Sequence, residues 1–268
     1  MTTLRIKGTV IGEDTPKIIV PLMGTNPHEL VAEARRAIAA GADFLEWRAD
    51  FLAEAHDPDA LAEACCALGE TLENMPIIAT LRTVPQGGHL NVGPMEYATL
   101  VRALASHGVV DLVDIEADKG DDLVRDLVHY ARVHGSHAIV SYHDFLATPP
   151  TEWMINQICR LHALGADIPK IAVMAHSSAD AARLMEATAA ASELIDAPLL
   201  TMAMGPHGTV TRLVGESFGS AMTFCSLERA SAPGQVSLAR ARAAIESLHF
   251  ALTESLDSTD NNADHGQR

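Results

Sequence analysis

The chain has 268 residues, of which 48% are hydrophobic, and its 19 Lys and Arg residues stand against 35 Asp and Glu residues, a net charge of −16. This length can bury a sizeable core in one or two domains. The acidic excess argues against nucleic acid and anionic membranes as partners, because both need a basic protein face, whereas a small anionic substrate needs only a local group of arginines.

Short runs rich in β-branched residues alternate with longer amphipathic runs along the chain. The opening segment, Leu4–Asp14, is typical of a β-hairpin. The strands that we expect are Ile18–Gly24, Phe44–Asp50, Pro76–Thr83, Leu112–Ala117, His137–Phe145, Ile168–Ala175, Pro198–Gly205 and Ala221–Leu227. Helical spacing is clearest over Pro27–Ala40, Met95–His107, Asp121–Val133 and Ser178–Ile195. Asn26-Pro27 and Ser178 are typical of helix starts, and Gly41 of a helix end.

The alternation of strands and helices implies a parallel sheet. About eight such units favour a closed α/β structure, the (β/α)8 TIM barrel, over an open doubly wound sheet. The N-terminal hairpin would close the bottom of this barrel. No GxGxxG turn follows the first strand, so nothing indicates a dinucleotide fold. We predict one barrel domain over residues 1–254 and a disordered polar tail over residues 255–268.

The cysteines and the absence of long apolar runs point to the cellular compartment. Cys65, Cys66, Cys159 and Cys225 form no CxxC pair and no cluster with histidine, so we expect no metal site. This usage fits reduced thiols in the cytoplasm. The first residues lack the apolar core of a signal peptide, and no apolar run reaches the roughly 18 residues of a membrane span.

Several predicted strands carry polar residues at alternate positions, which point to the same side of the strand, toward the barrel interior. They are Glu46, Arg48, Thr80, Arg82, Asp114, Glu116, Ser141, His143 and Lys170. A barrel interior usually holds Val, Ile and Leu, and so many polar groups facing one axis are costly unless they pair and bind something. Singly, each has a plain structural explanation, such as an ordinary ion pair between Glu46 and Arg48. Together they predict an active site.

Lys170 lies inside Asp167–Ala175, whose other residues are mostly apolar and typical of a buried strand. Burial disfavours the charged form of a lysine, and a neutral amine attacks carbonyls to give a Schiff base. The segment alone is equally compatible with a lysine at the start of a strand whose amino group reaches water. The convergent polar set favours catalysis, in which Lys170 forms an imine, His143 moves protons, and arginines bind a carboxylate or order hydroxyls.

Several stretches of the chain resemble the type I 3-dehydroquinate dehydratases, or type I dehydroquinases. They are Glu46–Asp50, Thr80–Thr83 with Gly87-Gly88, Ser141–Phe145, Pro169–Ala172, and a C-terminal block with Gly208–Leu213, Phe218–Ser220 and Ala230–Gln235. The resemblance covers Lys17–Leu248. It implies a cytoplasmic TIM-barrel lyase of the shikimate or quinate pathway, which dehydrates 3-dehydroquinate to 3-dehydroshikimate through a lysine imine.

The resemblance also implies roles for individual residues. Lys170 matches the Schiff-base lysine, and His143 matches the general acid/base. Substrate contacts are implied for Glu46, Arg48, Arg82, Arg212, Ser231 and Gln235. Among these, Arg212 matches the arginine that binds the substrate carboxylate, and Ser231 and Gln235 match a loop that closes over the substrate. No metal and no cofactor are implied, and a homodimer is compatible with the family.

Two positions depart from the family pattern. Gln86 stands where a glutamate commonly neighbours the histidine, and Pro21 stands where a serine is frequent. Gln86 can orient His143 through its amide oxygen but lacks the charge that stabilises an imidazolium, so the sequence predicts that Gln86→Glu raises kcat and moves the acidic limb of the pH–rate profile upward. Three alternatives remain open: an altered substrate, a binding homologue with reduced turnover, and a Schiff-base aldolase.

Overall fold

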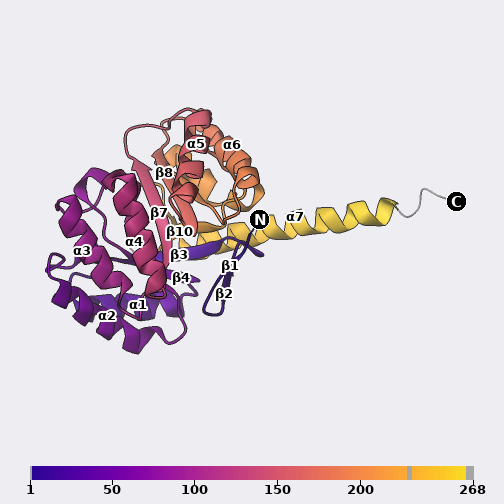
Figure 1. The fold of residues 1–268 in the computed structure, drawn as a ribbon. Helices are drawn as coiled ribbons and strands as arrows, with labels where there is room; N and C mark the ends of the chain where they lie inside the picture. The colour runs from indigo at the N-terminus through magenta and orange to yellow at the C-terminus, as the bar shows by residue number, and fades with distance from the viewer. Residues whose placement is uncertain (1, 228–230, 264–268) are drawn as a thin grey trace.

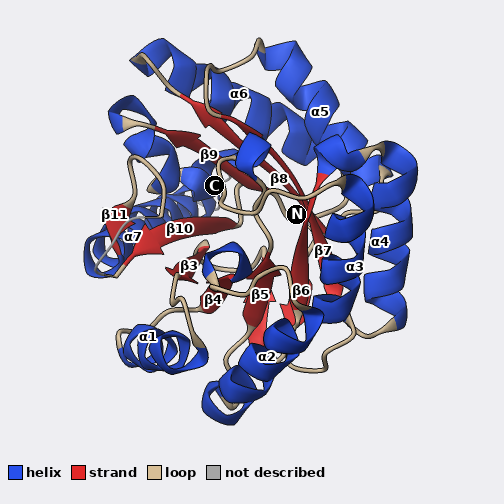
Figure 2. Ribbon diagram, turned by 90° about the vertical axis from the view of Figure 1, so that its left-hand side faces the viewer, coloured by secondary structure: helices blue, strands red, loops and turns tan. Residues whose placement is uncertain are grey.

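The computed structural model describes residues 2–227 and 231–263, with side chains described as far as residue 254. Within this range, parallel strands form the ring of a barrel (Figure 2). They are β3 (Lys17–Leu22), β4 (Phe44–Arg48), β5 (Ile77–Thr80), β6 (Leu112–Glu116), β7 (His137–Asp144), β8 (Ile168–Met174), β9 (Leu200–Met204) and β10 (Met222–Ser226). The ring closes between β9 and β10, where the backbone N–H of Ala221 donates to the carbonyl of Leu199 at 2.8 Å. The predicted TIM barrel is confirmed.

Helices cover the outside of the barrel (Figures 1 and 2). They are α1 (Pro27–Ala39), α2 (Pro58–Leu72), α3 (Pro94–Ala105), α4 (Asp121–Val133), α5 (Thr151–Ala163) and α6 (Ser178–Leu194). As predicted, α1 begins with Asn26, whose side chain accepts from the N–H of Glu29, and Gly41 follows its end with φ +85°. The cap of α6 is Ser177, one residue before the predicted Ser178.

Short 3-10 helices follow several strands at the C-terminal end of the barrel. They are η1 (Ala49–Phe51), η2 (Val84–Gln86), η3 (Ala117–Lys119), η4 (Pro206–Arg212) and η5 (Gly215–Phe218). The predicted strands end earlier than expected at Arg48 and Thr80, because the chain turns away from the ladder into these helices. Between β9 and β10, η4 and η5 stand where a (β/α)8 barrel usually has an α-helix. The turns carry Gln86 and Arg212 to the end of the barrel where the strands finish.

The N-terminal hairpin closes the bottom of the barrel, as predicted. Its strands β1 (Leu4–Ile6) and β2 (Thr9–Ile11) pair antiparallel, and Ile6 and Ile11 join an apolar cluster at the strand starts. The barrel strands supply to this cluster Ile19, Phe44, Ile78, Leu112, Ile139, Ile168, Leu200 and Met222. The bottom of the interior is therefore apolar and tightly filled, which leaves the opposite end for polar side chains.

The chain ends in a long helix. After β11 (Val236–Ser237), which pairs with β10, α7 (Leu238–Ala263) extends away from the body of the barrel (Figure 1). It includes part of the segment 255–268 for which the sequence predicts a disordered tail, while residues 264–268 lie outside the described part of the chain. The domain division at residue 254 stays a prediction. No helix in the described ranges has both the length and the apolar character that crossing a membrane requires.

Candidate active site

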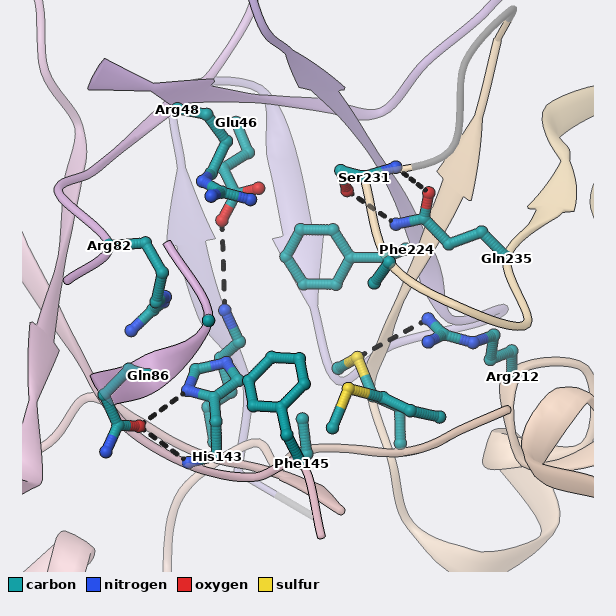
Figure 3. A pocket seen from close by; sticks show the side chains of 16 residues that line it. Glu46, Arg48, Arg82, Gln86, His143, Phe145, Arg212, Phe224, Ser231 and Gln235 are labelled. Carbon is teal, nitrogen blue, oxygen red and sulfur yellow. Dashed lines mark hydrogen bonds and ion pairs between the residues drawn. The ribbon is translucent and has the colours of Figure 1, made fainter. Parts of the chain in front are cut away.

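One pocket at the C-terminal ends of the strands gathers the polar residues that the sequence singles out. All the predicted site residues line it: Lys170, His143, Glu46, Arg48, Arg82, Arg212, Ser231, Gln235 and Gln86 (Figure 3). Phe44 and Ile168 lie in the bottom layer, and two residues further along the same strands Glu46 and Lys170 face the pocket. The parity argument is therefore correct, because side chains two apart on a strand point to the same side.

Lys170 is a buried member of an ion pair. Its side chain comes from the middle of β8 and the residue is 3% exposed. The Nζ atom lies 2.8 Å from Oδ2 of Asp114, 3.9 Å from Oε1 of Glu46 and 4.7 Å from the ring centroid of Phe224. The sequence indicates that Lys170 is buried among polar residues, and the structure identifies Asp114 as its carboxylate partner.

Asp114 joins Lys170 to a buried network on β5–β7. Its Oδ1 accepts from Arg82 at 2.8 Å and from the Ser141 hydroxyl at 2.6 Å, and Arg82 also pairs with Glu116 at 3.1 Å. Burial opposes ionisation of Asp114, but the cations of Arg82 and Lys170 outweigh it and hold the pKa of that carboxyl well below its usual range. Parity identified Asp114 and Glu116 as inward-facing, yet nothing in the sequence indicated their contacts with the lysine and arginine.

Glu46 and Arg48 do not form the ion pair with each other that the plain explanation supposes. The Thr80 hydroxyl donates to Glu46 at 2.9 Å, whereas Arg48 makes a bidentate pair with Asp50 at 2.8 and 2.7 Å. Asp50 thus holds the Arg48 guanidinium at the pocket wall. Pro21 lies in β3 directly beside Glu46 in the strand register, so the position lacks a hydroxyl next to this carboxylate.

His143 is held by Gln86. The amide Oε1 of Gln86 accepts from the backbone N–H of His143 at 3.0 Å and lies 3.2 Å from Nδ1 of the ring (Figure 3). An amide oxygen only accepts, so Nδ1 carries a proton and Nε2 is the nitrogen free to exchange one. The orienting role predicted for Gln86 therefore has the expected geometry.

The surroundings of His143 keep its ring neutral. Burial lowers the pKa of His143 well below its usual value, and the nearby cations of Arg82 and Lys170 act in the same direction, against a smaller opposing effect of Asp114. A neutral imidazole accepts protons at neutral pH. Once protonated in this site, it becomes a stronger acid than a histidine in water.

Arg212 is a buried cation without a carboxylate partner among the described residues. It is 2% exposed, its Nη2 lies 3.4 Å from the Pro233 carbonyl and its Nη1 3.6 Å from the Met202 sulfur. Its Nε has no hydrogen-bond partner, and burial lowers the pKa of Arg212 to about 10. The guanidinium remains charged at neutral pH, so the site is suited to an anion that enters the pocket.

Ser231 and Gln235 form the base of a loop at the pocket rim. The Ser231 N–H donates to Gln235 Oε1 and the Gln235 amide donates to the Ser231 hydroxyl, both at 2.9 Å. Gly234 packs against the backbone of Gly205, whose carbonyl oxygen would lie 2.4 Å from an added Cβ. The loop is thus docked on the barrel in this structure, with both side chains directed at each other.

Comparison with known proteins identifies relatives over nearly the whole chain. The family described as Type I 3-dehydroquinase matches residues 18–251. The 3-dehydroquinate dehydratase of Salmonella agona strain SL483 is 40% identical over 252 residues, which cover 94% of this chain and 100% of that protein.

Comparison with solved structures identifies the same kind of relative. The type I 3-dehydroquinate dehydratase from Clostridium difficile, crystallised with covalent modified comenic acid, superposes with a TM-score of 0.89 at 36% identity, over 93% of this chain and 98% of that one. The 3-dehydroquinate dehydratase from Geobacillus kaustophilus HTA426 gives 0.90 at 32% identity, over 93% and 97% of the two chains. With its barrel, its pocket and these relatives in agreement, the chain belongs to the type I 3-dehydroquinase family.

Proposed function

We propose that Lys170 and His143 carry out the reaction of this family, the dehydration of 3-dehydroquinate to 3-dehydroshikimate in the shikimate pathway. The observation that carries the assignment is the composition of the pocket. A buried lysine, a neutral histidine and a buried arginine with no carboxylate partner among the described residues line the same cavity. They supply the nucleophile, the base and the carboxylate site that this reaction needs.

Lys170 supplies the electron sink. Its amine condenses with the substrate ketone, releases water and forms a C=N bond, and the resulting iminium makes the adjacent C–H bond more acidic. Asp114, now 2.8 Å from Nζ, would remain beside the iminium and stabilise its charge. Attack requires that the lysine amine be unprotonated, and neutral His143 in the same pocket can accept the proton that it loses. His143 then returns this proton to the hydroxyl that leaves as water when the imine forms, so that its ring is neutral again for the next step.

His143 then serves in both halves of the elimination. Its Nε2 removes the proton next to the iminium, and the same nitrogen delivers a proton to the departing hydroxyl, which leaves as water. Hydrolysis of the imine returns the ketone and the free lysine. The low pKa of His143 suits the second step, because the imidazolium formed in this site gives up its proton readily.

The remaining polar residues hold the substrate. Arg212 takes the carboxylate, because among the side chains that the structure describes it is the buried cation with an unfilled donor. Glu46, Arg48 and Arg82 face the pocket from β4 and from the end of β5, where hydroxyls can contact them. We expect Ser231 and Gln235 to exchange part of their mutual contacts for contacts to the substrate when it binds.

We also propose that the protein acts in the cytoplasm as a homodimer. Cys65, Cys66, Cys159 and Cys225 are free thiols in the structure, which suits a reducing compartment. Light scattering of the purified protein measures its mass, and a monomer mass at working concentration would exclude the dimer.

The test of the function is turnover of 3-dehydroquinate, followed by the ultraviolet absorbance of the conjugated product. We expect release of 3-dehydroshikimate and water without cleavage of a C–C bond. Binding of 3-dehydroquinate with no turnover would instead favour the binding homologue, and cleavage products would favour the aldolase.

Turnover should not depend on a metal. The iminium is itself the electron sink, so no Lewis acid is required for the proton abstraction. Activity measured before and after incubation with EDTA is therefore expected to be the same. A loss that zinc or magnesium reverses would contradict the proposed chemistry.

A further inference from the structure

The amide of Gln86 has two different ends, and each meets a partner of the matching kind. Gln86 is 6% exposed. Its oxygen accepts from His143, and its Nε2 donates to Oδ2 of Asp118 at 3.2 Å. If the amide were turned over, its NH2 group would face the His143 N–H, and its oxygen would face a carboxylate. Both contacts would become repulsive, so the two partners select the same orientation.

Asp118 is itself fixed in place. It lies in η3, directly after β6, and its Oδ1 pairs with Lys119 at 3.0 Å. Lys119 also pairs with Glu116 at 2.8 Å and donates to the Thr83 hydroxyl at 3.0 Å. The Asp118 carboxylate is therefore anchored on one oxygen and free to accept from Gln86 with the other. It does not line the pocket and so has no direct access to the substrate.

The turn that carries Gln86 is equally constrained. η2 ends at Gln86 and is capped by Gly87, whose φ of +78° is in the left-handed region, and a Cβ at Gly87 would lie 2.2 Å from the Phe145 ring. The Gln86 side chain therefore reaches His143 and Asp118 from a backbone with little freedom to shift. Hydrogen bonds run without a break from Nδ1 of His143 through Gln86 to Asp118.

We propose that Asp118 is a positioning residue for His143. Asp118 fixes the amide of Gln86, and it supplies the negative charge that Gln86 lacks, one hydrogen bond further from the imidazole ring. The proposal rests on the role assigned above to His143. Through it, Nδ1 stays protonated and Nε2 stays directed at the substrate. The charged groups that shift the pKa of His143 include Arg48 from β4, Arg82 after β5, Asp114 from β6 and Lys170 from β8. Asp118, which is itself paired with Lys119, lies one hydrogen bond beyond Gln86.

This arrangement reverses the result expected for Gln86→Glu from the sequence. A glutamate at position 86 would place a carboxylate oxygen against Oδ2 of Asp118, where a hydrogen bond now lies. Two carboxylates at that distance repel, and one of them takes up a proton. The double variant Gln86→Glu/Asp118→Asn exchanges the positions of the charge and of the amide, and it restores a donor facing an acceptor.

The experiment is a double-mutant cycle on turnover of 3-dehydroquinate. Asp118→Asn should lower kcat by about 5-fold, the effect of one orienting hydrogen bond, with KM unchanged. Gln86→Glu alone should also lower kcat, and the double variant should recover it. Asp122→Asn is the matched control: it removes one exposed carboxylate at the start of α4 and should behave as wild type. Thermal melts establish that each variant is folded.

The pH dependence gives a second readout. Removal of the Asp118 charge should lower the pKa of His143 further, because a nearby anion favours the imidazolium. His143 must be neutral to accept a proton, so the acidic limb of kcat/KM should move down by roughly 0.3–0.5 pH unit in Asp118→Asn. Asp122→Asn should leave the limb in place.

A direct measurement separates this inference from the reaction itself. Nitrogen-15 NMR of the imidazole rings reports both the protonated nitrogen and the titration of His143, which is assigned by its absence from His143→Ala. Asp118→Asn should shift that titration even if 3-dehydroquinate proved not to be the substrate. The inference is overturned if Asp118→Asn changes neither kcat nor the His143 titration. It is also overturned if Gln86→Glu raises kcat and the double variant has the same kcat as Gln86→Glu alone.

Discussion

Borohydride added during turnover of 3-dehydroquinate should inactivate the protein and leave the substrate attached to Lys170. Borohydride reduces the C=N bond of an imine to an amine that water cannot hydrolyse. The chain contains four lysines, Lys7, Lys17, Lys119 and Lys170, so a single peptide map distinguishes all candidates. Lys170 is the one that lines the pocket.

Lys170→Ala should lower kcat by roughly 10⁴-fold or more, because it removes the nucleophile and with it the electron sink. Lys17→Ala is the control. The Lys17 amine donates to the backbone carbonyl of Glu13 outside the pocket, so this variant should keep both activity and trapping. Label on another lysine, or full activity of a folded Lys170→Ala protein, would reject the imine mechanism.

The strand parity visible in the sequence was sufficient to locate the polar layer of the barrel. Glu46, His143 and Lys170 lie on separate strands and Arg82 follows β5, and parallel strands bring such positions to one end of the fold. The positions of the strands followed from the β-α alternation. Arg212, Ser231 and Gln235 lie outside strands, and they were found only through the family resemblance.

The contacts of these residues could not be predicted from the sequence. Asp114 and Lys170 lie on β6 and β8, with β7 between them, and they meet because their side chains reach across the barrel interior. Asp118 lies in a 3-10 helix of three residues that has no periodic signal. Its contact with Gln86 depends on the path of two turns after different strands, so the sequence expectation for Gln86→Glu omitted the group that the structure places against it.

Substitution of Arg212 should weaken substrate binding while leaving the fold at least as stable as before. In the folded protein, burial lowers the pKa of Arg212 to about 10, below its usual value. The charged form is therefore less favourable in the folded state than in the unfolded chain at all pH values below about 10. This penalty decreases only as the pH rises from there toward the usual pKa of an arginine. A bound carboxylate offsets this penalty. The burial that makes the Arg212 charge costly in the free protein therefore strengthens its contact with the substrate carboxylate.

Arg212→Ala should accordingly raise KM by about 30-fold or more, which corresponds to the ~2 kcal/mol lower limit for losing one side of a buried charge pair, with a smaller effect on kcat. Arg212→Lys keeps a positive charge but not the planar guanidinium group, so its KM should lie between those of the wild type and Arg212→Ala. The increase in melting temperature that substrate gives the wild type should largely disappear in Arg212→Ala, whereas the melting temperature of the free protein should stay the same or rise. An unchanged KM in a folded Arg212→Ala protein would mean that the carboxylate binds elsewhere, and the unpaired Nε of Arg212 would then need another anion to explain it.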